Sequence, residues 1–249
     1  MTDIEYIIDF HLGGKRQGPG SDKETLKALS FIDIINNKDL RVADIGSGTG
    51  AQTISIANNI DGKVLAVDLF PQFLDKVNEN ANKLGLQDKV LTMEASMDKL
   101  PFITNEFDII WSEGAIYNIG FENGLRQWKP FIKEGGYVAV TEISWLSNNR
   151  PSEVHEFWTN AYPEIDTISN KTKVIEENGY SPVAHFILPN NCWLDNYYNP
   201  MEERFSSFLK KHANSKAAKA IIDGEQKEIE LYKKYGTYYG YVFYIAKRI

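Results

Sequence analysis

The sequence has few of the residues that mark disulfide-rich, zinc-binding or membrane-spanning proteins. Its one cysteine, Cys192, excludes an internal disulfide framework and a cysteine-based zinc site, and it fits a reducing, cytoplasmic location. His155, His185 and His212 have no ligand-like spacing with acidic residues, and we predict no metal site. No apolar run approaches the roughly 20 residues of a membrane span, and no secretory signal pattern is visible. We therefore expect no membrane partner.

Positive charge is also scarce. The 249 residues include 27 Lys and Arg against 34 Asp and Glu, for a formal net charge of −7. Phosphate contacts need clustered basic side chains, so this balance disfavours a nucleic-acid partner. The length suits one α/β domain spanning 1–249. The oligomeric state stays open, and a homodimer is among the options.

The central feature that is present is an apolar strand that ends in a carboxylate and runs into a glycine-rich turn, at 41–50. Gly46, Gly48 and Gly50 permit a tight turn and a close ligand approach. With Ala51 the turn fits a dinucleotide pattern, and as G-x-G-x-G it also fits an S-adenosylmethionine pattern. Asp68, 18 residues beyond Gly50, ends the next strand and could bind ribose in either case. The turn alone leaves both nucleotides open.

Strands and helices alternate along most of the chain. We expect strands at 40–45, 63–68, 89–93, 107–111, 137–143, 183–188 and 239–246. A helix is expected from Ser21 to Asn36, a turn at 134–136, and a long helical region over 200–235 that breaks near 223–224. This alternation predicts an α/β fold with a mostly parallel sheet and helices on both faces.

Five motifs in order resemble the class I S-adenosylmethionine-dependent methyltransferases. They are Val42–Gly50, Ala66–Asp68, Ala95–Phe102, Phe107–Ala115 and Leu125–Gly136. The whole chain is similar to a bacterial, methyltransferase type 11-like group acting on small molecules, which carries Arg16–Gly20 and Ser112–Gly120. The resemblance implies a Rossmann-like, doubly wound sheet of seven strands, the last antiparallel, and S-adenosylmethionine as cofactor with S-adenosylhomocysteine as product.

The resemblance also implies residue roles around the cofactor. The three turn glycines would admit its methionine part, Asp44 would orient the ammonium group, and Asp68 would accept both ribose hydroxyls. The full predicted set is Arg16, Asp44, Gly46, Ser47, Gly48, Gly50, Asp68, Leu69, Ser96, Met97 and Ser112.

Two members of this set need comment. Ser96 stands where many relatives carry an Asp that accepts from the adenine amino group, and a hydroxyl is a weaker acceptor, so Met97 could contribute packing and a backbone N–H instead. Arg16 is the candidate for binding the cofactor carboxylate, because guanidinium and carboxylate pair bidentately; the alternative is a solvated loop arginine. Leu69 would pack on the adenine face, and Ser112 would offer backbone contacts near the sulfonium.

Candidate catalytic residues are Glu113, His11, Tyr117 and Glu142. The two glutamates follow the fourth and fifth strands, so a carboxylate pair beside the sulfonium could act as a base or bind a cationic amine. The alternative is that each is structural.

The resemblance divides the chain into an N-terminal cap and first helix (1–38), a cofactor core (39–144), and lid insertions at 145–178 and 189–235. The predicted activity is methyl transfer to a small-molecule acceptor by in-line displacement. The competing functions are an NAD(P)-binding oxidoreductase and a catalytically silent S-adenosylmethionine-binding protein.

Overall fold

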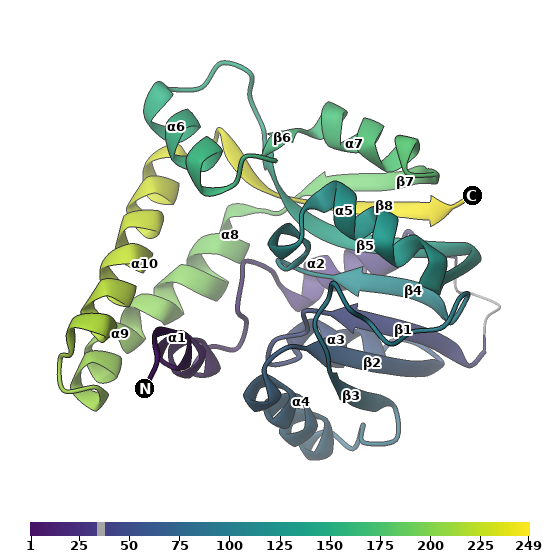
Figure 1. The fold of residues 1–249 in the computed structure, drawn as a ribbon, viewed down its shortest axis with the longest axis horizontal. Helices are drawn as coiled ribbons and strands as arrows, with labels where there is room; N and C mark the ends of the chain where they lie inside the picture. Colours follow the sequence, from purple (N-terminus) through teal and green to yellow (C-terminus); the bar gives the residue numbers. More distant parts are fainter. Residues whose placement is uncertain (34–37) are drawn as a thin grey trace.

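The computed structural model, which describes residues 1–33 and 38–249, is built around a mixed β-sheet (Figure 1). The sheet order is β3-β2-β1-β4-β5-β8-β7, and the short strand β6 pairs with β5. Strands β1 to β5 are parallel, whereas β8 runs antiparallel to both β5 and β7. The predicted fold class is confirmed. The strands are β1 (Leu40–Ile45), β2 (Gly62–Asp68), β3 (Val90–Glu94), β4 (Phe107–Ser112), β5 (Ile132–Trp145), β6 (Asp166–Thr167), β7 (Tyr180–Ile187) and β8 (Tyr239–Arg248).

Helices cover both faces of the sheet and its carboxyl edge. Figure 1 shows α1, α9 and α10 beside the carboxyl ends of the parallel strands. The α-helices are α1 (Asp3–Leu12), α2 (Asp22–Leu29), α3 (Ala51–Ala57), α4 (Pro71–Lys83), α5 (Phe121–Trp128), α6 (Ser152–Ala161), α7 (Ile168–Glu177), α8 (Asn190–Trp193), α9 (Asn199–Lys211) and α10 (Lys216–Tyr235). Two short 3₁₀ helices, η1 (Ile116–Asn118) and η2 (Lys129–Phe131), and a π-helix, η3 (Leu194–Tyr198), complete the elements.

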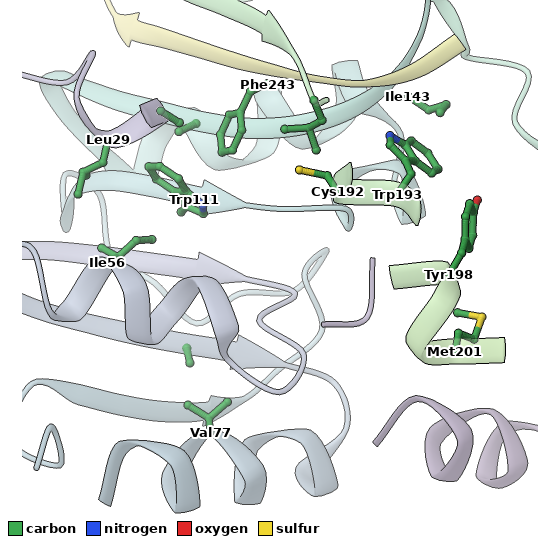
Figure 2. Packing of buried hydrophobic residues seen from close by; sticks show 14 of the residues in the cluster. Leu29, Ile56, Val77, Trp111, Ile143, Cys192, Trp193, Tyr198, Met201 and Phe243 are labelled. Carbon is green, nitrogen blue, oxygen red and sulfur yellow. The ribbon is translucent and has the colours of Figure 1, made fainter. Parts of the chain in front are cut away.

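Strand alternation sends neighbouring side chains into two separate cores. Trp111 packs on one face with residues of α2 and α3, and its ring lies 5.3 Å from that of Phe243 (Figure 2). Ile110, the preceding residue, packs on the other face against α5 and α7. Both faces are therefore apolar, as expected for a sheet that helices cover on both sides.

The structure corrects three local predictions. Helix α2 ends at Leu29, and the predicted extension over 34–37 lies outside the described residues. The break in the C-terminal helical region falls at 212–215, where Ala213 and Asn214 have positive φ and Ser215 caps α10, so Gly224 stays helical. The expected turn at 134–136 lies inside β5. The register between β4 and β5 shifts between Phe107 and Ile109, and this irregularity accommodates the positive φ of Gly135.

Candidate functional site

A cavity of about 530 Å³ opens at the carboxyl ends of β1, β2 and β4. Pockets of this size suit small molecules and cofactors. Its walls come from α1, the loop residues 16–19, and the segments that follow β1, β2, β3 and β4. The wall contains eleven of the fifteen predicted site residues, namely His11, Arg16, Gly46, Ser47, Gly48, Asp68, Leu69, Ser96, Met97, Glu113 and Tyr117. Asp44, Gly50, Ser112 and Glu142 do not line it.

The glycine turn forms the floor of the cavity. Gly46 has a φ of +74°, and a Cβ there would collide with the side chain of Ala115. The buried hydroxyl of Ser47 finds no hydrogen-bond partner among the described residues. A buried polar atom without a partner is uncommon and costs free energy, so it points to a polar ligand or water at this position. The floor thus has close backbone access and an unused polar group.

Asp44 lies behind the turn. It is fully buried and accepts hydrogen bonds from Thr53 Oγ1 at 2.5 Å and from Gln52 Nε2 at 3.3 Å. Burial raises the pKa of this carboxyl to about 7, and the charges of Glu113 and Asp68 add to the rise. Asp44 can therefore act on the cavity only through the turn and Gln52, which does line the wall.

Asp68 joins the glycine turn to the end of β2. Its Oδ2 accepts from the Gly48 N–H at 2.9 Å, and its Oδ1 accepts from the Phe70 N–H at 3.0 Å. Burial raises the pKa of the carboxyl. These two backbone donors orient the carboxylate at the cavity wall beside Leu69.

The segment at 95–98 supplies the opposite wall. Ser96 Oγ donates to Asp98 Oδ1 at 2.5 Å, and both residues and Met97 line the cavity. The Met97 carbonyl accepts from Trp128 Nε1 at 3.0 Å, which holds the segment against the core. The sequence prediction missed Asp98, although a carboxylate two residues after the substituted position was a visible signal.

Arg16 and Glu113 form a buried ion pair at the cavity wall. Arg16 Nη1 lies 3.1 Å from Glu113 Oε2, and Arg16 Nη2 lies 2.8 Å from Asp22 Oδ1. Glu113 Oε1 also accepts from Thr25 Oγ1 at 2.7 Å and from Trp111 Nε1 at 2.9 Å. Arg16 is 8% exposed, so the alternative of a solvated loop arginine does not hold.

Gln17 was part of the Arg16–Gly20 motif but was given no role. Its Oε1 accepts from the Thr49 N–H at 2.8 Å and from the Thr49 hydroxyl at 3.0 Å. Its Nε2 donates to the carbonyls of His11 and Gly14. Gln17 therefore ties the N-terminal segment onto the glycine turn, and it lines the cavity.

Glu142 does not meet Glu113. It pairs in register with Val242, on the face covered by α7, and its Oε1 lies 2.7 Å from Lys171 Nζ. Glu113 contacts Trp111, which packs on the opposite face. The predicted carboxylate pair is not formed, because strand alternation directs the two side chains to different sides of the sheet.

Gly50 and Ser112 also lie off the wall. Gly50 is the N-cap of α3, and the buried Oγ of Ser112 donates to the Ile45 carbonyl at 2.8 Å and so links β4 to β1. His11 and Tyr117 line the cavity. Burial and the charge of Arg204 lower the pKa of His11 to about 4, so its ring is neutral at pH 7. Among the described residues, no helix could cross a membrane, and no group of three or more His, Cys, Asp and Glu is placed to hold a metal ion.

Comparison with known proteins places this cavity in context. Residues 42–136 match the family described as "Methyltransferase domain". A "Ubiquinone/menaquinone biosynthesis C-methyltransferase" of Azotobacter vinelandii is 30% identical over 125 residues, which cover 49% of each chain. The chain thus spans about half the length of the curated relatives that match it at this level.

Two further comparisons extend over nearly the whole chain. A "Phosphoethanolamine N-methyltransferase" of Plasmodium falciparum is 23% identical and covers 94% of this chain and 88% of its own. The structure of a methyltransferase from Geobacter sulfurreducens, in complex with S-adenosyl-L-homocysteine, superposes with a TM-score of 0.80 at 17% identity, covering 93% of each chain. The fold is therefore shared over 93% of this chain.

Proposed function

We propose that the chain, whose residues 42–136 match the methyltransferase domain family, is a class I enzyme that transfers a methyl group from S-adenosylmethionine to a small-molecule acceptor. The observation that carries the proposal is the cavity at the glycine turn, where Asp68 ends β2 and the Ser47 hydroxyl lacks a partner among the described residues. One domain would span 1–249, with the cap at 1–38, the core at 39–144 and lid insertions at 145–178 and 189–235.

The wall residues fit the cofactor from one end to the other. The backbone at Gly46 and Gly48 and the Ser47 hydroxyl would hold the methionine part, and Asp68 would accept the ribose hydroxyls. Leu69 and Met97 would pack on the adenine ring. Asp98, which Ser96 holds in place, would accept from the adenine amino group and so replace the carboxylate that is missing at position 96.

The remaining predicted residues would act at the methionine end. Arg16 uses two of its five N–H donors in the pairs with Glu113 and Asp22, so it retains donors for the cofactor carboxylate. Glu113 would orient Arg16. Asp44 would support the turn from behind, Gly50 would begin α3, and Ser112 would hold β4 against β1.

Catalysis would come mainly from alignment. The bound cofactor supplies a methyl group already activated by a sulfonium charge, and the chain holds the acceptor in line and excludes water. Orientation of this kind contributes roughly 7–11 kcal/mol. His11 and Tyr117 lie at the wall where an acceptor proton could be taken up, whereas Glu142 is fully buried against Lys171 and would serve the scaffold.

Calorimetry tests the cofactor half of this proposal. We expect a heat of binding when S-adenosylhomocysteine is titrated into the protein and none when NAD is titrated. A heat of binding with NAD alone would favour the oxidoreductase. Asp68→Asn should weaken S-adenosylhomocysteine binding at least tenfold. Asp75→Asn, on the exposed face of α4, is the matched control and should bind like the wild type.

An acceptor screen with S-adenosylmethionine tests the second half. Formation of S-adenosylhomocysteine would eliminate a silent binding protein, and its absence with every acceptor would support one. The cytoplasmic location, supported by the free thiol of Cys192, and the homodimer stay hypotheses. Sedimentation analysis would decide the oligomeric state.

A further inference from the structure

Beyond the cofactor cavity, side chains from η3, α10 and β8 meet next to His11 and Tyr117. His11 Nε2 lies 3.8 Å from Glu225 Oε1 on α10. Tyr198 OH donates to Glu228 Oε1, one turn further along α10, at 2.8 Å. We call this group the carboxylate–tyrosine cluster. It consists of His11, Tyr117, Tyr197, Tyr198, Glu225, Glu228 and Tyr241.

The cluster adjoins the cofactor cavity. His11, Tyr117 and Gly114 belong to the cavity wall, and a Cβ added to Gly114 would lie 3.5 Å from the ring of Tyr241. Burial raises the pKa of Tyr197. The nearby carboxyls of Glu225 and Glu228 and the phenols of Tyr241 and Tyr117 add to this rise. The contacts of Glu225 with His11 and of Tyr241 with Gly114 therefore place the cluster beside the cavity wall, where an acceptor would reach the methyl end of the cofactor.

Among the described residues, the two glutamates of this region lack a cationic partner at ion-pair distance, and Arg204 acts on Glu225 from further away. Within the described residues, Glu228 forms no ion pair, and the one basic group within 4 Å of Glu225 is His11, which is neutral at pH 7. Burial and the charge of Glu228 raise the pKa of Glu225 to about 7, and Arg204 opposes this rise. Both glutamates are partly buried, and a carboxylate withdrawn from water gains from a cation beside it, because an unpaired charge is costly in an apolar surrounding.

The aromatic side chains suit the same kind of ligand. The ring of Tyr197 lies 5.2 Å from that of Tyr198, and the ring of Tyr241 lies beside Gly114 of the cavity wall. Tyrosine rings attract ammonium groups over their faces within about 6 Å, and a free phenol oxygen can accept an N–H. The cluster therefore combines ring faces, acceptor oxygens and two carboxylates.

We infer that the methyl acceptor is a small amine, held through its positive charge by Glu225, Glu228 and the tyrosines of this cluster. This inference rests on the proposed methyl transfer. The ammonium first gives a proton to the Glu225 carboxylate. The nitrogen lone pair then forms the bond to the methyl carbon while the carbon–sulfur bond breaks, and the electron pair leaves with sulfur as a neutral thioether. The product carries the positive charge on nitrogen.

A matched pair of probes isolates the charge. Choline and 3,3-dimethyl-1-butanol have the same shape and differ in one positive charge, and choline resembles a fully methylated amine product. On protein saturated with S-adenosylhomocysteine, we expect calorimetry to show choline binding at least tenfold more tightly than the alcohol. Glu228→Gln and Glu225→Gln should each remove most of that difference. Glu230→Gln, on the exposed side of α10, is the control and should leave it unchanged.

The ionisation of Glu225 gives a second readout. Choline has a permanent charge, so a pH dependence must come from the protein. The groups facing Glu225 are His11 on α1, Arg204 on α9, Glu228 on α10, and Tyr197 and Tyr117. Ionisation of Glu225 near pH 7 adds negative charge, so choline affinity should rise between pH 6 and pH 8, and Glu225→Gln should flatten this profile.

Three results have distinct meanings. No binding of S-adenosylhomocysteine would contradict the proposed function itself. Binding of S-adenosylhomocysteine with no choline binding, or with equal affinity for choline and the alcohol, would overturn the amine inference and leave the proposed function standing. A tenfold preference for choline that survives both glutamine substitutions would place the amine elsewhere and would also overturn it.

Discussion

At the scale of single residues, Glu142 and Lys171 form a buried ion pair on which stability depends. The two side chains are 0% and 4% exposed, and Glu142 Oε2 has no hydrogen-bond partner among the described residues. Lys171 Nζ also lies 4.6 Å from the ring centre of Phe121 and 5.3 Å from that of Tyr162. The lysine thus offsets a carboxylate that burial would otherwise make costly, and burial still raises the pKa of Glu142.

We predict that Lys171→Met lowers the free energy of unfolding by about 3–5 kcal/mol, because it leaves Glu142 buried without a partner. Urea denaturation measures the loss. Lys173→Met, on the same helix but 70% exposed, should change stability by less than about 0.5 kcal/mol. The double variant Glu142→Gln/Lys171→Met should recover much of the loss, and no recovery would contradict the ion-pair explanation.

Single residues also differ in whether their place in the site could be predicted from nearby residues in the sequence. The carboxylate at the end of β2 and the glycines after β1 could be predicted, because their roles follow from neighbours in the chain. The partners of Arg16 could not, because Glu113 lies 97 residues away in sequence. Gln17 was missed for the same reason, because its partner Thr49 lies 32 residues away, whereas Asp98 was missed although its neighbour Ser96 is only two residues away.

At the scale of elements, the junction of β1, the glycine turn and α3 determines the shape of the cavity floor. Gly50 occupies the N-cap position of α3 with a φ of +83°. A Cβ there would lie 2.8 Å from Val77 Cγ2 on α4. Both the backbone angle and the packing of α4 therefore require glycine at this position.

We predict that Gly50→Ala lowers the free energy of unfolding by about 1–3 kcal/mol, through left-handed strain and the contact with Val77. It should also weaken S-adenosylhomocysteine binding. Gly224→Ala is the control with the opposite sign, because Gly224 lies inside α10 and an added Cβ would meet nothing within 4 Å. That change should stabilise the protein by about 0.5–1 kcal/mol. Equal effects of the two substitutions in urea denaturation would refute this account.

Gly224 also shows why element boundaries were harder to predict than elements. A glycine beside an aspartate indicated a helix break, but Ile222 and Ile229 pack in the core on either side and keep α10 continuous. The actual break at 212–215 depends on two residues other than glycine with positive φ, Ala213 and Asn214. Tertiary packing therefore outweighed local propensity at both places.

At the scale of the whole molecule, the sheet order assembles the site. The order β3-β2-β1-β4-β5 brings the carboxyl ends of β1, β2 and β4 side by side, so segments from 46–48, 68–70 and 113–119 share one cavity. Helices α1, α9 and α10 stand beside that edge (Figure 1) and add His11 and the glutamates of α10. A ligand bound there would join the N-terminal, central and C-terminal parts of the chain.

We predict that S-adenosylhomocysteine raises the melting temperature of the whole chain. At a concentration of 100 times its Kd, a ligand that binds the native state alone adds about 2.7 kcal/mol. For a chain of this size that corresponds to roughly 5–10 °C. NAD at the same concentration should cause no shift, and Asp68→Asn should show a much smaller shift with S-adenosylhomocysteine. A scanning calorimeter records all three, and a shift with NAD alone would count against the assignment.

The sequence by itself determined the layered α/β fold and the location of the cofactor cavity, because strand periodicity, glycine turns and strand-end carboxylates act over a few neighbouring residues. The tertiary structure alone decided which charges meet. It paired Arg16 with Glu113, sent Glu142 to Lys171 on the other face of the sheet, and placed Glu225 beside His11. The physical reason is that ion pairs and shared cavities depend on the packing of segments far apart in the chain, which no local pattern specifies.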